Sequence, residues 1–272
     1  MTVNRLWAEV FGRGIVPSAE DFGRRGEIPT HPELLDWLAV EFVEGGWSIK
    51  NFIRLIVTSA TYRQSSRGSA ELRERDPDNT LLALGPRFRL PAESIRDSLL
   101  AAGGLLSLEM GGPPVHPPQP QGLLGEISGV AERQYPASEG ADRRRRGVYT
   151  ILRRGALYPS FTTFDASPRH ACAVMRARTN SPLQALTLLN DPAYVEVANA
   201  LAKLVMELPE ASDRERLVYA FRRAVTRAPS TVELQELTRQ LNEFRETLES
   251  ESEAWVSLAR VLLNLDETIT KS

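Results

Sequence analysis

Residues that can do chemistry gather in one stretch of the chain, from residue 164 to residue 190. It holds the only cysteine, Cys172, two positions after His170, and Asp165 precedes both. A thiol beside an imidazole can become a thiolate nucleophile, and a carboxylate can orient the imidazole. One hypothesis is therefore an enzyme site of the hydrolase or oxidoreductase type, acting on an anionic or carbohydrate substrate, with Asp165, His170 and Cys172 as its catalytic candidates.

The same three residues also fit a segment without chemistry. A spacing of two residues rarely brings an imidazole and a thiol within the ~3 Å that proton transfer needs. In the alternative interpretation, Cys172 is a small buried residue that packs as a hydrophobe, and His170 lies on the surface. We expect no metal site, because the three side chains mix hard and soft ligands in no recognised spacing.

Polar side chains around this stretch predict a binding site for an anion. The candidates flank the start of a helix at Ser181, and they are Arg153, Arg154, Arg176, Arg178, Thr179 and Asn180. Free N–H groups and the dipole at a helix start favour negative charge, and arginine forks suit carboxylate, sulfate or phosphate. The alternative is a structural brace, in which Arg176 and Arg178 turn back toward Asp165 and hold an irregular segment in shape.

Composition and charge exclude several classes of protein. Of the 272 residues, 42% are hydrophobic and 25% are charged, as in ordinary soluble globular proteins. A net charge of −2 argues against a nucleic-acid-binding protein, which usually has a basic domain. A single cysteine excludes an internal disulfide and covalent haem attachment, so we expect no cofactor in this chain. No apolar run approaches the ~20 residues of a membrane helix.

Hydrophobic periodicity predicts a mainly α, bundle-like fold. The clearest helix carries Ile49, Phe52 and Ile56 on one apolar face. Three further helices begin with a capping box, at Ser181, Ser212 and Ser230. The one strand that we predict runs from Gly147 to Arg153, where β-branched and aromatic residues concentrate.

Changes in composition divide the chain into three segments. We predict an N-terminal helical lobe (1–110), a Pro- and Gly-rich surface excursion (111–146) and a C-terminal lobe (147–272), with the two lobes packed as one unit. The excursion contains His116, which we expect to be exposed, and ends in the basic run Arg143–Arg146. Four arginines can bind nucleic acid, but without interleaved aromatic residues we interpret them as a solvated loop.

Three motifs together resemble one known family. They are NRLWAEVFGRGIV and DFGRRGEIPTHPELLDWLAVEF within Asn4–Phe42, NFIRLIVTSATYRQSS at Asn51–Ser66, and RARTNSPLQALTLLNDP at Arg176–Pro192. Long strings match in order over nearly the whole chain, most weakly in the Pro-rich excursion. The chain resembles the C-terminal domain of unknown function 1553 in large planctomycete proteins that carry a cytochrome c domain near their N-terminus.

The resemblance implies a setting for this chain but no reaction. Members of that family are exported proteins of several domains, so it implies an extracytoplasmic location and a haem only in an upstream domain. The helical pattern begins immediately after Met1, and we therefore expect the chain to start partway through a longer protein. The leading hypothesis is a non-catalytic docking or scaffold module that binds upstream domains or a protein partner.

Overall fold

The computed structural model describes residues 1–120, 136–153, 157–170 and 172–271. Helices make up about half of the chain, and β-structure among the described residues is limited to one two-stranded ribbon and two isolated bridges. Contacts divide the chain into two compact units. Unit 1 is Met1–Arg89, Ala173–Met175 and Thr270–Ser272, and unit 2 is Leu90–Cys172 and Arg176–Ile269. The prediction of a mainly α fold is confirmed.

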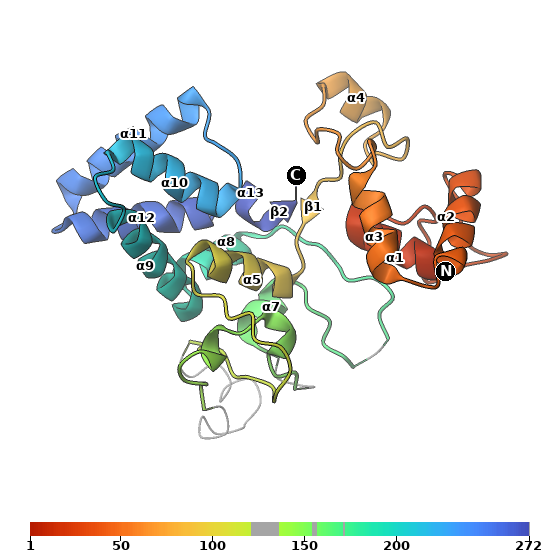
Figure 1. Cartoon of the computed structure of the whole chain (residues 1–272), viewed down its shortest axis with the longest axis horizontal. Coiled ribbons are helices and arrows are strands. Elements are labelled where there is room, and N and C mark those ends of the chain that lie inside the picture. Colours follow the sequence, from red (N-terminus) through yellow and green to blue (C-terminus); the bar gives the residue numbers. More distant parts are fainter. Residues whose placement is uncertain (121–135, 154–156, 171, 272) are drawn as a thin grey trace. The chain divides into compact units, whose positions relative to one another are not determined.

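Unit 1 consists of four helices and the ribbon (Figure 1). Its elements are α1 (Thr2–Phe11), α2 (Pro32–Glu44), α3 (Ile49–Thr58), α4 (Ala70–Arg75), β1 (Phe88–Arg89) and β2 (Thr270–Lys271). β1 and β2 pair antiparallel, with Phe88 opposite Lys271. Gly12 ends α1 in the left-handed conformation, with φ of 85°, which costs glycine nothing because it has no Cβ.

The core of unit 1 forms where α1, α2 and α3 turn their apolar faces toward one another. The buried residues are Val3, Trp7, Phe11, Ile15, Leu38, Phe42, Phe52 and Ile56. Asn4 is buried beside them, and its side chain donates to Val16 O at 3.0 Å and accepts from Val16 N at 2.8 Å. This pair of hydrogen bonds satisfies the buried amide and fixes the loop after α1 against the helix.

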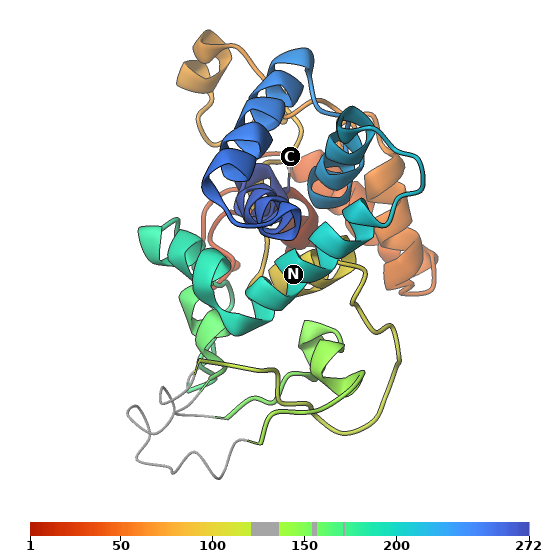
Figure 2. The ribbon, with the colours of Figure 1, turned by 90° about the vertical axis from the view of Figure 1, so that its left-hand side faces the viewer.

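Unit 2 contains most of the helices of the described chain. Its elements are α5 (Ala92–Ala102), the 3₁₀ turns η2 (Asp142–Arg144) and η3 (Gly147–Tyr149), α7 (Pro159–Thr163), α8 (Pro182–Asn190), α9 (Pro192–Met206), α10 (Asp213–Val225), α11 (Thr231–Thr247), α12 (Glu251–Leu263) and α13 (Asp266–Ile269). α12 packs against both α9 and α11, and the second view shows these helices side by side (Figure 2). α5 belongs to this unit, although it lies within the predicted N-terminal segment 1–110.

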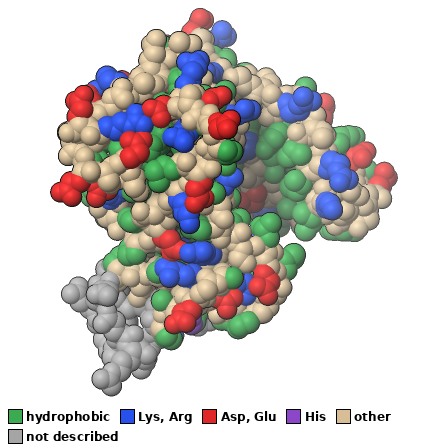
Figure 3. All heavy atoms as spheres, turned by 60° about the vertical axis from the view of Figure 1, so that its left-hand side comes forward, with side chains coloured by type: hydrophobic (Ala, Val, Ile, Leu, Met, Phe, Trp, Pro, Cys, Tyr) green, Lys and Arg blue, Asp and Glu red, His purple; other side chains and the backbone are tan. Residues whose placement is uncertain are grey.

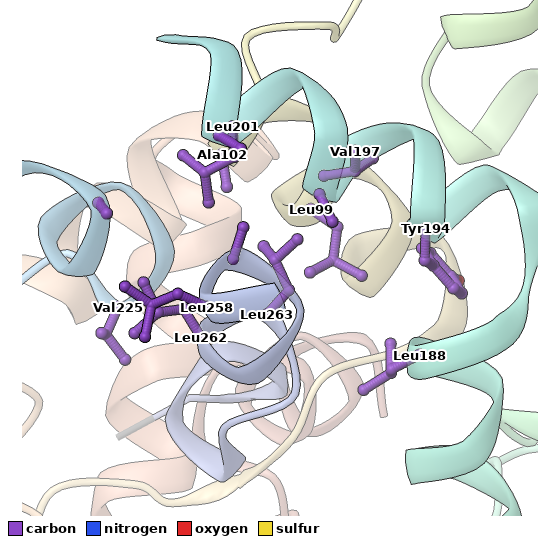
Figure 4. Packing of buried hydrophobic residues seen from close by; sticks show 14 of the residues in the cluster. Leu99, Ala102, Leu188, Tyr194, Val197, Leu201, Val225, Leu258, Leu262 and Leu263 are labelled. Atoms are coloured by element: carbon purple, nitrogen blue, oxygen red, sulfur yellow. The ribbon is translucent and has the colours of Figure 1, made fainter. Parts of the chain in front are cut away.

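One continuous core holds unit 2 together. Leu99 of α5, Val197 of α9 and Leu263 of α12 point toward one another, and Val225 of α10 meets Leu258 of α12 nearby (Figure 4). Each buried leucine contributes about 1.5–3 kcal/mol relative to an exposed one. Capping boxes start α10 at Ser212 and α11 at Ser230, as predicted, with Glu215 and Glu233 completing them.

The predicted strand Gly147–Arg153 is wrong. Gly147–Tyr149 form a 3₁₀ turn, and only Thr150 makes a β-bridge, to Val115. Val115 accepts from Ile151 N at 2.9 Å and donates to Tyr149 O at 2.8 Å. Prolines lie on both sides of Val115 and have no N–H to donate, so the ladder cannot extend beyond this one residue.

The interpretation of Arg143–Arg146 as a solvated loop is also wrong. Arg145 is 2% exposed, and its guanidinium lies 4.0 Å from the centre of the Tyr149 ring. It donates to the carbonyl oxygens of Glu109 (3.3 Å), Gly111 and Pro113 (3.5 Å). A Cβ on Gly112, whose φ is 88°, would lie 3.1 Å from this guanidinium. The glycines and prolines of the excursion thus wrap the backbone closely around one buried arginine.

Two neighbouring arginines of the run are ion-paired as well. Arg143 Nη2 lies 2.7 Å from Glu196 Oε2, and Arg144 Nη2 lies 2.6 Å from Glu196 Oε1. The run therefore fastens the end of the excursion to α9. His116, also predicted to be exposed, is half-buried.

Charges of both signs cover the face of the molecule formed mainly by the C-terminal helices (Figure 3). Several are paired, as in Arg245 with Asp213 (2.6 Å) and Arg245 with Glu251 (2.5 Å). Exposed pairs of this kind contribute up to about 1 kcal/mol each. Within the described part of the chain, no helix has the length and apolar character needed to cross a membrane.

Candidate functional site

Asp165 and Thr179 are hydrogen-bonded to each other within the stretch 164–190. Asp165 follows α7 in the left-handed conformation, with φ of 59°, which aspartate tolerates better than most residues. Its Oδ2 accepts from Thr179 N and from Thr179 Oγ1, each at 2.8 Å. Hydrogen bonds to an ionised acceptor are the stronger kind, so Thr179 holds this carboxylate in one orientation.

Gln184 extends this network into the interior. Its side chain is 1% exposed, and its Nε2 donates to Thr163 O at 3.0 Å and to Thr179 Oγ1 at 3.1 Å. Its Oε1 accepts from Ser181 N at 3.4 Å, which completes the predicted box at the start of α8. Gln184 therefore joins the start of α8 both to the end of α7 and to Thr179.

His170 and Cys172 lie on the surface. The exposed thiol contradicts the interpretation of Cys172 as a small buried residue. Within the described ranges, neither His170 nor Cys172 makes a hydrogen bond, and no group of three histidine, cysteine or acidic side chains is placed to hold a metal ion. The catalytic roles of Asp165, His170 and Cys172 stay predictions.

The predicted arginines lie in different surroundings. Arg176 Nη1 lies 2.6 Å from Glu93 Oε2. Burial works to raise the pKa of Glu93, but hydrogen bonds from Arg176 and from its own backbone amide outweigh burial and lower it. Arg153 lies near His116, where its positive charge adds to burial in lowering the pKa of that imidazole.

Three further predicted binding residues are Arg154, Arg178 and Asn180. Arg178 and Asn180 are exposed, and Arg154 lies outside the described residues. The ion pair of Arg176 is with Glu93 on α5, and both the brace toward Asp165 and the anion site stay predictions.

Arg96 is a buried charge on α5, and it is not among the candidate residues predicted from the sequence. It is 1% exposed, donates from Nη2 to Arg143 O at 2.7 Å and lies 5.9 Å from the centre of the Tyr158 ring. Its position between Ile95 and Leu99 was the available signal, because both neighbours lie on the core stripe of α5. A buried guanidinium needs several such partners to offset its desolvation.

Asp191 and Tyr194 lie in the field of Arg96. Burial raises the pKa of Asp191 to about 6, although the Ala193 amide, 2.9 Å from Oδ1, and the charge of Arg96 favour the ionised form. Burial also raises the pKa of Tyr194 to about 12, and its hydroxyl lies 2.5 Å from Ser160 Oγ. These contacts join α5, α7 and α9. Because all of these side chains are buried, a substrate could not reach them.

A cavity of about 430 Å³ lies within unit 1. Its apolar wall includes Trp7 and Phe11, whose rings stack with centroids 4.1 Å apart. Its polar wall includes Arg13, Arg73 and Asp76. None of the residues proposed from the stretch 164–190 lines it. The sequence did not predict it, because its walls combine α1, the short helix α4 and loops that share no motif.

Comparison with known proteins identifies a family for the whole chain. The model of the family PSD1, described as a protein of unknown function (DUF1553), matches residues 1–241. The chain belongs to this family. The matched region of this DUF1553 protein includes the cavity, the Asp165–Thr179 network and the buried Arg96. No match was found among curated proteins or among solved structures.

Proposed function

We propose that this chain is a non-catalytic docking module of a larger exported protein, and that its partner binds the exposed face of α2. The observation that carries this proposal is a helix that is apolar on two sides. Leu38 and Phe42 face the core of unit 1, while Trp37, Val40 and Val43 are 48%, 52% and 50% exposed. Apolar side chains that lie together on an exposed helix face often mark a site of protein–protein interaction, so the outer face of α2 is a candidate interaction surface.

The charges on α2 define the chemistry of the partner. Its four acidic residues are exposed, none is ion-paired within the described chain, and the helix has no basic residue; they are Glu33, Asp36, Glu41 and Glu44. Helical spacing places most of them beside Trp37, Val40 and Val43. The complementary ligand is a basic amphipathic helix, which inserts apolar side chains and pairs its lysines or arginines with the acidic rim.

The same charges argue against a second copy of this chain as the occupant. Two α2 faces in contact would bring eight carboxylates together, and like charges across an interface cost several kcal/mol, on the order of 2–5. We therefore commit to a protein partner that presents a basic amphipathic helix. The partner could be a separate protein or an upstream domain of the same polypeptide, and the peptide-binding test below distinguishes the two.

The test uses a synthetic amphipathic peptide of leucine and lysine, titrated into the whole chain by calorimetry. We expect saturable binding that weakens with added salt. Val40→Glu should weaken it at least tenfold, because a carboxylate would be desolvated in the contact. The matched control is Val232→Glu on α11, a valine that is 74% exposed and should leave affinity unchanged.

Two further titrations decide the outcome. A scrambled peptide of the same composition, with no apolar face, should bind at least tenfold more weakly. Equal binding of both peptides, or equal loss in Val40→Glu and Val232→Glu, would show that charge alone attracts the peptide and would contradict a docking surface. If a longer form of the protein fails to bind the peptide while this chain binds it, the occupant is an upstream domain.

The enzyme hypothesis has no comparable observation in its favour. The Asp165 oxygens accept hydrogen bonds from Thr179, and His170 and Cys172 are exposed. The extracytoplasmic location, and a haem in an upstream domain only, follow from the family resemblance and remain part of the proposal.

A further inference from the structure

The cavity of unit 1 has walls that are rigid without a ligand. Asp76 Oδ1 accepts from Thr80 N (2.8 Å) and Thr80 Oγ1 (2.7 Å), and its Oδ2 accepts from Leu81 N (2.8 Å). The Asn79 side chain bonds both backbone groups of Leu84, at 2.8 and 3.0 Å. The loop that forms one wall thus carries its own hydrogen bonds, which is typical of a pre-formed binding site.

Close backbone packing completes this wall. A Cβ on Gly85 would lie 2.2 Å from Gln64 O, so only glycine allows the two segments to approach. Another wall is the edge of the unit 1 core, where Phe11 stacks on Trp7 and meets Tyr62 edge to face, with the Phe11 and Tyr62 ring centroids 5.8 Å apart. Both walls are therefore held by contacts that a ligand does not have to supply.

One of the arginines that line the cavity has no acidic partner in the described part of the chain. Arg13 is paired with Asp78, with Nη1 2.6 Å from Oδ2, and the Asp76 oxygens are occupied by Thr80 and Leu81. Arg73 also lines the cavity, and within the described chain its guanidinium makes no ion pair and no hydrogen bond. A cavity lined by aromatic rings and by a guanidinium that is unpaired among the described residues suits a ligand with a negative group on a flat apolar body.

We propose that this cavity binds a small aromatic or unsaturated carboxylate, with Arg73 holding the carboxylate and the Trp7–Phe11 wall contacting the ring. The volume of about 430 Å³ accommodates a ligand of this size. Arg13 is a second anchor, because its partner Asp78 is two-thirds exposed and can release it. This site is separate from the α2 face and does not depend on the docking role.

The test titrates benzoate into the whole chain, followed by calorimetry and by the chemical shift of the Trp7 indole N–H. We expect a dissociation constant in the millimolar range, typical of a fragment, and a shift at Trp7. Acetate has the charge without the ring, and benzyl alcohol has the ring without the charge. Both should bind at least fivefold more weakly than benzoate.

Three variants locate the anion. Arg73→Gln should weaken benzoate binding at least fivefold, whereas Arg75→Gln, an exposed arginine on the same helix outside the cavity lining, should not change it. Asp78→Asn should strengthen binding twofold or more, because it frees Arg13. All three positions are exposed, so folding is expected to survive each change.

Several results would overturn the proposal. No benzoate binding, a Trp7 indole signal that does not move, or equal binding of benzyl alcohol would each contradict an aromatic-carboxylate site. Equal effects of Arg73→Gln and Arg75→Gln would show that benzoate senses only the charge of α4.

Discussion

The carboxylate of Asp165 is oriented by Thr179, which donates to it from both its backbone N–H and its hydroxyl, each at 2.8 Å from Oδ2. The two residues are fourteen positions apart in sequence. Their contact joins two positions on either side of His170 and Cys172.

The Asp165–Thr179 contact predicts a coupled effect of mutation on stability. Asp165→Ala should lower the free energy of unfolding by about 1–2 kcal/mol, since it removes the acceptor and puts alanine at positive φ. Asp165→Asn and Thr179→Val, made singly and together, should show a coupling energy of about 0.5–1.5 kcal/mol in urea denaturation. Additive effects of the two changes would contradict a direct contact.

The control for this experiment must be chosen from the structure. Asp76 looks like a surface residue in the sequence, but it accepts three hydrogen bonds and would itself be costly to replace. Asp21 is exposed, and its carboxylate makes no hydrogen bond or ion pair within the described chain. Asp21→Ala should therefore change stability by less than about 0.5 kcal/mol.

Asp191 predicts a pH dependence of stability. Its pKa is raised in the fold from 3.8 to about 6, so between these values the folded state binds more protons than the unfolded state. The contribution of Asp191 to stability therefore falls as pH rises through this window and is fully lost above pH 6. Asp191→Asn keeps a cap residue for α9 but cannot titrate, so relative to the natural chain it should gain about 2–3 kcal/mol between pH 4 and pH 7.

Urea denaturation of both proteins across this pH range measures the difference directly. Comparing the variant with the natural chain cancels the other titrating carboxylates, several of which have lowered pKa values and the opposite pH dependence. A difference that stays constant with pH would show that the fold does not shift the pKa of Asp191, and one that moves in favour of the natural chain as pH rises would show that the fold lowers it.

The contacts of Arg145 predict a large loss of folding stability even when lysine keeps the positive charge. Lysine cannot stack on Tyr149 or reach three carbonyl oxygens at once, so Arg145→Lys should cost about 2–4 kcal/mol. Arg144→Lys, at the partly exposed pair with Glu196, should cost less than about 1 kcal/mol. Thermal denaturation of both variants checks this, and similar losses in the two would contradict the buried role of Arg145.

The sequence predicted those parts of the fold that depend on residues close together in the chain. The apolar face of α3 follows from Phe52 and Ile56, and the starts of α10 and α11 follow from Ser212 and Ser230 with a glutamate three residues later. Such signals depend on helical periodicity and on capping geometry, and both are set within a few residues.

The parts that long-range partners decide were missed. The four-arginine run resembles a solvated loop until Glu196 and the carbonyls near Gly111 are placed around it. The Gly147–Arg153 segment has strand composition, but its only β-bridge in the described chain joins Thr150 to Val115, which lies between prolines. Within the predicted site, sequence proximity grouped Arg176 with Asp165, whereas its ion pair is with Glu93, eighty-three positions away.

The α2 face that we propose for docking was partly visible in the sequence. Trp37 lies at the edge of the buried stripe of α2, and the helix carries more apolar residues than one face can use. The sequence could not show which of them the fold covers, because that depends on how α1 and α3 pack against α2.

The measurement that tests the docking proposal most directly is an amide chemical-shift map of the whole chain with the leucine–lysine peptide. Docking on α2 predicts shifts concentrated between Glu33 and Trp47, and unshifted signals along α11, from Thr231 to Thr247. Shifts spread over the acidic surface of both helices, or confined to any region other than α2, would contradict it.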